Sequence, residues 1–250
     1  MSVTTSALLF GLASAFFFGL SKTGVPGTGI LGVLIMMLAF PGTEKLSSGA
    51  VLPLLIVADI FAVRYYWRFA DWQRIRQLLP SVVVGLCLGT VFMRAIDHTQ
   101  FKLFLAVLVL ALISFEQLRR WRNWNTFPKS RWFARTMGLL SGFTTLVGNA
   151  AGPVMTVYCA SQNFNKHDFM GTFAIFFFIV NLAKLPLMGG AVPGLNMITA
   201  DTLWFDFLLL PGLLVGAILG RQLFKVIPER YFVPCVLFLN LIVPIQIILF

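Results

Sequence analysis

Two glycine-rich segments, Gly19–Gly29 and Gly142–Gly152, interrupt apolar stretches that otherwise suit membrane helices. Both segments also carry small hydroxyl residues, and a proline lies in the first and directly after the second. Backbone that leaves a helix at membrane depth loses its internal hydrogen bonds, so it is tolerated only where it is buried in protein or lines a wet cavity. Two such breaks, each near the start of one half of the chain, are typical of a binding site in a transporter.

The composition indicates that the solvent of this chain is a lipid bilayer. Of its 250 residues, 58% are hydrophobic and 11% are charged, whereas an ordinary soluble domain carries about 25% charged residues. A small chain cannot hide so much apolar surface from water, so we expect an integral membrane protein. The net charge of +10 does not indicate a nucleic-acid partner, because the basic residues gather in short gaps between apolar runs, as they do in cytoplasmic loops.

Ten apolar runs predict an all-α polytopic membrane protein. Their approximate bounds are residues 5–20, 28–40, 46–66, 77–95, 99–118, 133–147, 150–162, 168–189, 203–222 and 231–250. The first two runs of each set of five are shorter than the roughly 20 residues that a crossing needs. Each short pair therefore forms either a re-entrant hairpin or two tilted short spans, and the sequence leaves both alternatives open.

The two halves share a pattern of glycine, proline and phenylalanine. Gly19 and Gly29 recur at a shift of 123 as Gly142 and Gly152. At a shift of 131, the matching pairs are Pro80 and Pro211, Gly85 and Gly216, Gly89 and Gly220, and Phe101 and Phe232. The change of shift predicts an insertion within residues 188–202. We expect two repeats, residues 1–120 and 133–250, each a broken short-helix pair followed by three transmembrane helices, with a basic cytoplasmic linker at 121–132.

The distribution of Lys and Arg predicts the orientation. The gaps at residues 64–76, 119–135, 166 and 221–230 hold 14 of the 19 basic residues, and such clusters stay on the cytoplasmic side. This assignment places both termini outside a cell membrane, such as the bacterial inner membrane. The first break is then reached from outside and the second from inside, so the halves would be inverted repeats.

Each break offers groups that bind anions. The candidate substrate-binding residues are Ser21, Lys22, Thr23, Gly24, Gly27, Thr28 and Gly29 in the first break, and Thr144, Thr145, Asn149, Ala150 and Gly152 in the second. A helix that starts at mid-membrane presents unpaired N–H groups and the positive end of its dipole, and glycine lets an anion approach the backbone closely. The alternative is that these glycines only permit close helix packing.

Three charged residues and one amide lie inside apolar runs. Lys22 costs about 2.5–3.5 kcal/mol at the membrane centre unless it pairs or faces water, so it either contacts the anion or pairs with an acidic residue or with carbonyl groups. Asp59 and Lys184 are candidates for coupling or gating, or they reach the inner and outer membrane faces. Asn181 aligns with Asp59 at a shift of 122 and is a candidate for the same role or for a hydrogen bond between helices.

The ordered motifs of the breaks resemble the TauE/SafE family of sulfite and organosulfonate exporters. They are GLSKTGVPGTGILG from Gly19, LPLLIVAD ending at Asp59 and TTLVGNAAGPVM from Thr144, and the resemblance covers nearly the whole chain. The second break has Asn149-Ala-Ala-Gly152 in place of the run of glycines found in the glycine-richest members. The resemblance implies a membrane transporter, not an enzyme, that takes a small anion such as sulfite or an organosulfonate.

We therefore expect an exporter that works by alternating access, without a cofactor or a metal. A non-transporting scaffold or assembly protein is the first alternative. An intramembrane enzyme is the second, and it would require His, Asp or Glu clustered at the breaks, where the chain has almost none. The GxxxG segments at 85–89 and 216–220 predict close helix contacts, either within one chain or in a homo-oligomer. The Phe16–Phe18 and Phe176–Phe178 runs are interpreted as lipid-facing or packing residues rather than a binding box.

Overall fold

The computed structural model describes residues 4–101, 130–232 and 234–236, with residues 103, 104, 107, 108, 111 and 114 between them. In this part of the chain every regular element is a helix. Five helical stretches are long and apolar enough to cross a membrane. They are α1 (Thr5–Thr23), the run Glu44–Phe69, α5 (Trp72–Ala95), α9 (Lys166–Met188) and α10 (Ala200–Val226). The prediction of an all-α polytopic membrane protein is confirmed.

The shorter elements lie at the breaks and in the run Glu44–Phe69. They are α2 (Gly29–Leu38), α3 (Glu44–Ala50), α4 (Leu52–Tyr66), the 3₁₀ turn η1 (Trp67–Phe69), α7 (Arg131–Gly148) and α8 (Gly152–Ser161). The apolar run predicted at 46–66 is thus two helices separated at Val51. Pro53 explains this break, because it has no N–H to donate to the carbonyl of the residue four positions earlier.

The first break turns the chain back on itself. Gly32 of α2 packs against the ring of Phe18 and the carbonyl of Ser14 on α1, and Gly29 lies beside Ser21. The Ser14 hydroxyl donates to the Gly32 carbonyl over 2.6 Å. Positions that are later in α2 therefore face positions that are earlier in α1, so the two helices form an antiparallel helical hairpin.

The second break makes an equivalent turn. α7 ends at Gly148 and α8 begins at Gly152, while the ring of Phe133, near the start of α7, stacks on Tyr158 of α8 with centroids 6.3 Å apart. The chain thus returns toward the end of the molecule from which α7 came. In both breaks the second helix thus doubles back along the first.

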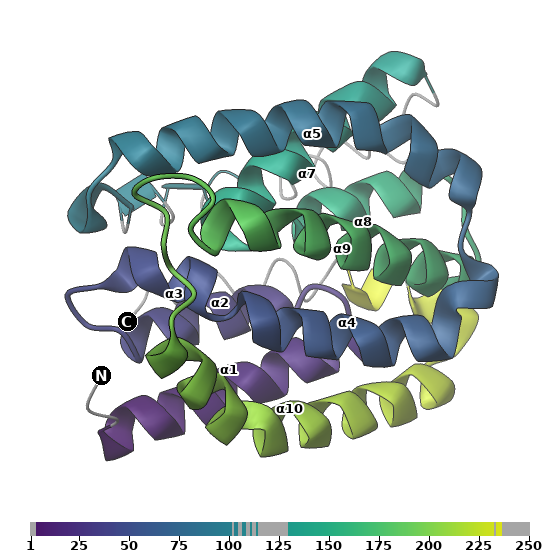
Figure 1. Ribbon diagram of the computed structural model, residues 1–250. Helices are drawn as coiled ribbons and strands as arrows, with labels where there is room; N and C mark the ends of the chain where they lie inside the picture. Colours follow the sequence, from purple (N-terminus) through teal and green to yellow (C-terminus); the bar gives the residue numbers. More distant parts are fainter. Residues whose placement is uncertain are drawn as a thin grey trace.

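Each broken helix packs on the long helix of the other half. α1 lies along α10 at the bottom of Figure 1, α5 lies along α7 at the top, and α4 and α9 lie between the two pairs. At several glycines an added β-carbon would overlap a carbonyl oxygen of the paired helix, among them Gly19 against Leu213, Gly142 against Val82, Gly85 against Leu139, and Gly216 against Phe16. These glycines therefore allow the backbones to touch, and both predicted GxxxG segments make their contacts within the chain.

The shifts found in the sequence also relate these contacts. Gly19 contacts Leu213, and Gly142 contacts Val82. Gly142 lies 123 positions after Gly19, and Leu213 lies 131 positions after Val82, so the two contacts correspond to each other. The contact of Gly85 with Leu139 corresponds to that of Gly216 with Phe16 through the same two shifts. Residues 189–199 form a long connection between α9 and α10, at the place where the change of shift predicted an insertion.

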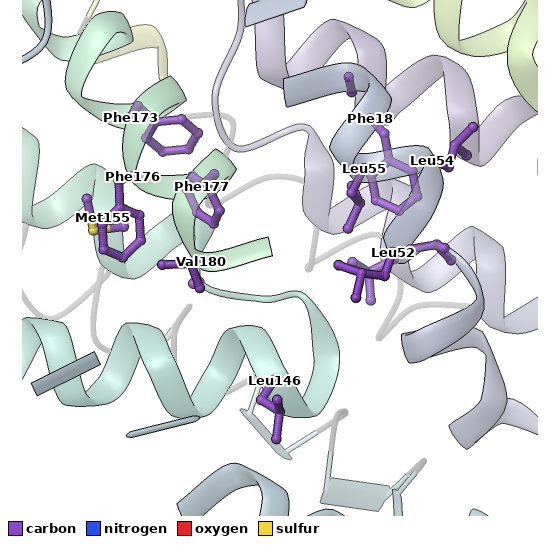
Figure 2. Packing of buried hydrophobic residues seen from close by; sticks show 14 of the residues in the cluster. Phe18, Leu52, Leu54, Leu55, Leu146, Met155, Phe173, Phe176, Phe177 and Val180 are labelled. Atoms are coloured by element: carbon purple, nitrogen blue, oxygen red, sulfur yellow. The ribbon is translucent and has the colours of Figure 1, made fainter. Parts of the chain in front are cut away.

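Aromatic side chains fill the centre between the two pairs. Figure 2 shows Phe173, Phe176 and Phe177 of α9 gathered on one side and Phe18 on the other. Phe176 is fully buried, and Phe177 and Phe18 are nearly so. The lipid-facing interpretation is therefore wrong for these three residues, because α9 is a central helix that neighbouring helices cover.

Candidate functional site

Both breaks open onto one cavity in the middle of the molecule. It encloses about 470 Å³ of empty space, counted with its opening, and only a small part of this space is wide enough for water. The predicted site residues that line it are Ser21, Lys22, Gly27, Gly29, Thr145, Asn149, Ala150, Gly152 and Asn181. The other lining residues are mostly apolar: Phe18, Ile30, Leu55, Pro153, Phe173 and Phe177. The tertiary fold thus brings together residues about 120 positions apart in the sequence.

Four predicted site residues lie beside this cavity without lining it. The Thr23 hydroxyl donates to the Ala217 carbonyl over 2.7 Å, and Gly24 packs against the backbone of Gly220. The Thr28 and Thr144 hydroxyls donate to carbonyl groups of their own segments, those of Val25 and Leu140. The three hydroxyls therefore bond to backbone carbonyl groups, and Gly24 permits a close helix contact, the role that the packing alternative gave to the glycines.

Two helices begin at the cavity with unpaired amides. Neither α2 nor α8 has a side-chain cap at its first turn. The N–H groups of Gly29, Gly152 and Val154 form no hydrogen bond with any residue that the structure describes. An added β-carbon at Gly152 would meet no atom within 4 Å, so this glycine faces open space. The two N-termini together provide donors and positive dipole ends for an anion.

Lys22 holds a buried ion pair at the edge of the cavity. Its Nζ lies 2.7 Å from Oδ1 of Asp59 on α4 and 4.0 Å from the centroid of the Phe177 ring. Lys22 is 7% exposed and Asp59 is fully buried. The acidic partner considered for Lys22 is thus present, and the same ammonium also lines the cavity.

A chain of hydrogen bonds continues from this ion pair to the second break. Asn181 Nδ2 donates to Asp59 Oδ2 over 2.6 Å, and Lys184 Nζ donates to Asn181 Oδ1 over 3.1 Å. Lys184 Nζ also donates to Asn149 Oδ1 over 2.5 Å and to Thr145 Oγ1 over 3.3 Å. Because Asp59 and Lys184 have no exposed surface, the interpretation that they reach the two membrane faces is wrong.

This network carries more cations than anions. It contains the ammonium groups of Lys22 and Lys184 and the single carboxylate of Asp59. With all three groups ionised, one positive charge is left beside the cavity. A buried charge without a counter-ion is costly unless the group gives up its charge.

Ser48 and Tyr66 stabilise the breaks, and sequence reasoning missed both. The Ser48 hydroxyl donates to the Val147 carbonyl over 2.7 Å, and the Tyr66 hydroxyl donates to the Thr23 carbonyl over 2.6 Å. They satisfy carbonyl groups that the ends of α7 and α1 leave without a helical partner. No local sequence signal marks them, because each partner lies on a distant segment.

Asn149 fixes the shape of the second break. Its backbone has φ of 52°, in the left-handed region, and its side-chain Nδ2 donates to the Ser48 carbonyl over 2.8 Å. We predict that Asn149→Ala lowers the free energy of unfolding by about 2–4 kcal/mol, from the left-handed strain on alanine and the lost side-chain hydrogen bonds. Asn149→Gly loses the same hydrogen bonds without the strain. Its free energy of unfolding, measured by chemical or thermal unfolding, should therefore be about 1–2 kcal/mol higher than that of the alanine variant. Equal stability of the two variants would contradict this account.

In the part of the chain that the structure describes, no group of three or more His, Cys, Asp or Glu side chains gathers where it could hold a metal ion. His167 lies instead between the rings of Phe69 and Phe224, with centroids 5.0 and 5.2 Å away.

The chain was compared with known proteins in three ways. Searches of curated proteins and of solved structures gave no match. The family model described as "Sulfite exporter TauE/SafE" matches residues 7–247. This match spans both breaks, α1 from Ala7 onward and the other four apolar stretches described above. The family is one of membrane transporters rather than enzymes, and with the apolar helices it establishes a multi-pass membrane protein. The chain therefore belongs to the sulfite exporter TauE/SafE family.

Proposed function

We propose that this protein exports a small anion, such as sulfite or an organosulfonate, and holds it between the two helix breaks during transport. The observation that carries the proposal is the shared cavity. It joins the Lys22 ammonium with the unpaired N-termini of α2 and α8. Sulfur oxyanions present several acceptor oxygens, and the cavity presents N–H donors from both sides. Its apolar walls include the rings of Phe18 and Phe177, which would accept the organic part of a sulfonate.

The charges of the site favour an anion with one negative charge. Such an anion balances the single excess cation of the network formed by Lys22, Asp59 and Lys184. Its exit from a cell gains about 2.3 kcal/mol for each 100 mV of inside-negative potential. The membrane potential is therefore sufficient to drive export, and no coupling ion is required by the energetics.

The packing suggests which parts would move. α1 packs with α10 and with α2, whereas α7 packs with α5 and with α8. A rocking of one sequence repeat against the other would break the contacts of α1 with α10 and of α5 with α7. We propose instead that the moving units are the two interlocked groups, with α4 and α9 between them. The substrate then lies where the units meet, and inverted repeats are the arrangement that supplies two such units.

The same arrangement supports the expected placement of the N-terminus outside. α1 and α10 start at one end of the molecule and α5 and α7 start at the other (Figure 1). Arg74 and Arg76 in α5, and Arg131 and Arg135 in α7, lie near the starts of their helices. The proposed cytoplasmic side is therefore the end where α5 and α7 begin.

Transport by purified protein in liposomes tests the function. We expect efflux of sulfite or of a small alkyl sulfonate to exceed that from protein-free liposomes, and to rise when the potential is made negative inside. Labelling Ser130→Cys with an impermeant thiol reagent reports which way the protein is inserted. A folded, correctly inserted protein that moves neither anion at any potential would contradict the proposal and favour the scaffold alternative.

A further inference from the structure

A second cavity lies between α5 and α7 near the ends where both helices begin. It encloses about 550 Å³ of empty space, counted with its opening. Its lining residues are Arg76, Gln77, Pro80, Ser81, Arg131, Ala134 and Arg135. We propose that this cavity binds the phosphate-bearing headgroup of an anionic phospholipid. The proposal concerns a different place in the molecule from the transport site, and it does not depend on which anion is transported.

The three arginines of this cavity have no acidic partner among the described residues. The acidic residue nearest in sequence to Arg76, Asp71, caps the start of α5 and lies 4.0 Å from Arg74 instead. Arg135 lies 5.8 Å from the centroid of the Trp132 ring, a weak contact that leaves its N–H groups available. Guanidinium groups bind phosphate oxygens through paired N–H donors. Three of them around one hollow therefore form a site for a phosphate group rather than a set of internal ion pairs.

Helix packing does not demand these basic residues. By the shift of 123, Arg131 and Arg135 of α7 correspond to Leu8 and Leu12 of α1. By the shift of 131, Arg76 and Gln77 of α5 correspond to Phe207 and Leu208 of α10. The α1–α10 pair thus makes the same kind of helix joint with apolar side chains. Because the joint forms without charge in one pair, the arginines in the other pair have a role besides packing.

The depth of the cavity suits a lipid headgroup. Trp72 at the start of α5 is 48% exposed, and Trp132 at the start of α7 is 74% exposed. Exposed tryptophans at helix ends sit at the level of the headgroups. From Trp72 to Ser81 the helix rises about 13 Å, so the cavity reaches from the headgroup level toward the acyl chains. A soluble anion would use only its outer part, whereas a phospholipid fills its whole depth. Basic pockets between transmembrane helices on the cytoplasmic side bind such headgroups.

Native mass spectrometry of the purified protein tests the proposal. The protein would be titrated with phosphatidylglycerol, and separately with phosphatidylcholine, in a neutral detergent. We expect the first bound phosphatidylglycerol to bind roughly 100-fold more weakly in the triple variant R76Q/R131Q/R135Q, since each arginine contributes about 1 kcal/mol. Phosphatidylcholine should bind weakly to both proteins. The matched control is Arg68→Gln, an exposed arginine at the same end of the molecule that lies over Trp67 instead of this cavity.

Two further measurements distinguish a phospholipid from a soluble phosphate and separate lipid binding from protein stability. Glycerol 1-phosphate, which lacks acyl chains, should not compete with phosphatidylglycerol at millimolar concentration. Effective competition would show a site for a soluble anion and overturn the proposal. Equal phosphatidylglycerol affinity in the wild type and the triple variant would also overturn it. Thermal unfolding in lipid-free detergent should be the same for both proteins, which separates loss of lipid from loss of fold.

Discussion

Gly152→Val should reduce anion transport by at least about 10- to 200-fold, the range that a single methylene group of misfit gives in a binding pocket. The side chain would extend from the first residue of α8 into the central cavity, because nothing lies within 4 Å of its β-carbon position. It would occupy the space next to the unpaired N–H groups of α8, where we place the anion. Thermal unfolding should change little, and Gly152→Ala should reduce transport less.

The matched control for this prediction is Gly142→Ala. Its β-carbon would overlap the Val82 carbonyl where α7 touches α5, so we expect a loss of stability of about 1–3 kcal/mol from overpacking. Gly142 and Gly152 belong to the same break motif, but one glycine serves helix contact and the other leaves room in the cavity. Transport by Gly152→Val at the wild-type rate would show that the anion does not bind at the α8 N-terminus.

Lys22→Met should abolish transport and destabilise the protein. It removes the ammonium that lines the cavity and leaves the Asp59 carboxylate without its ion-pair partner, 2.7 Å away in the wild type. Removing one member of a buried ion pair costs about 3–5 kcal/mol. Reconstituted transport and thermal unfolding in detergent would measure the two effects separately.

The double variant K22M/D59N separates stability from function. It has neither charge of the pair, and the new amide oxygen still accepts the hydrogen bond from Asn181 Nδ2. We therefore expect it to regain most of the lost stability and to remain inactive, because the anion still lacks the ammonium. A stable double variant that transports the anion as the wild type does would remove Lys22 from the binding site.

Much of the fold could be predicted because the bilayer restricts the choices. Apolar runs separated by basic gaps predicted the helices, and the breaks at Gly19–Gly29 and Gly142–Gly152 lie where α1 and α7 end. The recurring glycines predicted close helix contacts, and the structure shows them between α1 and α10 and between α5 and α7. The break at Val51 was missed, because Pro53 sits within an unbroken run of apolar residues.

The candidate site was only partly predictable from sequence. The sequence identified Lys22, Asn149 and Gly152 as unusual for membrane helices, and all three line the cavity. It could not show that Thr23 and Thr144 bond to carbonyl groups instead. A threonine near a helix end suits either role, and only the positions of the neighbouring helices decide between them.

The sequence by itself determined the solvent of this chain, the number and approximate bounds of its broken helices, and the unusual residues placed among apolar ones. These properties follow from local hydrophobicity and from the residues that disrupt a helix. Only the tertiary structure decided that each broken helix packs on the opposite half, and that Lys22, Asp59, Asn181 and Lys184 form one network. Contacts between residues more than a hundred positions apart depend on how helix surfaces fit together, and no single segment carries that information.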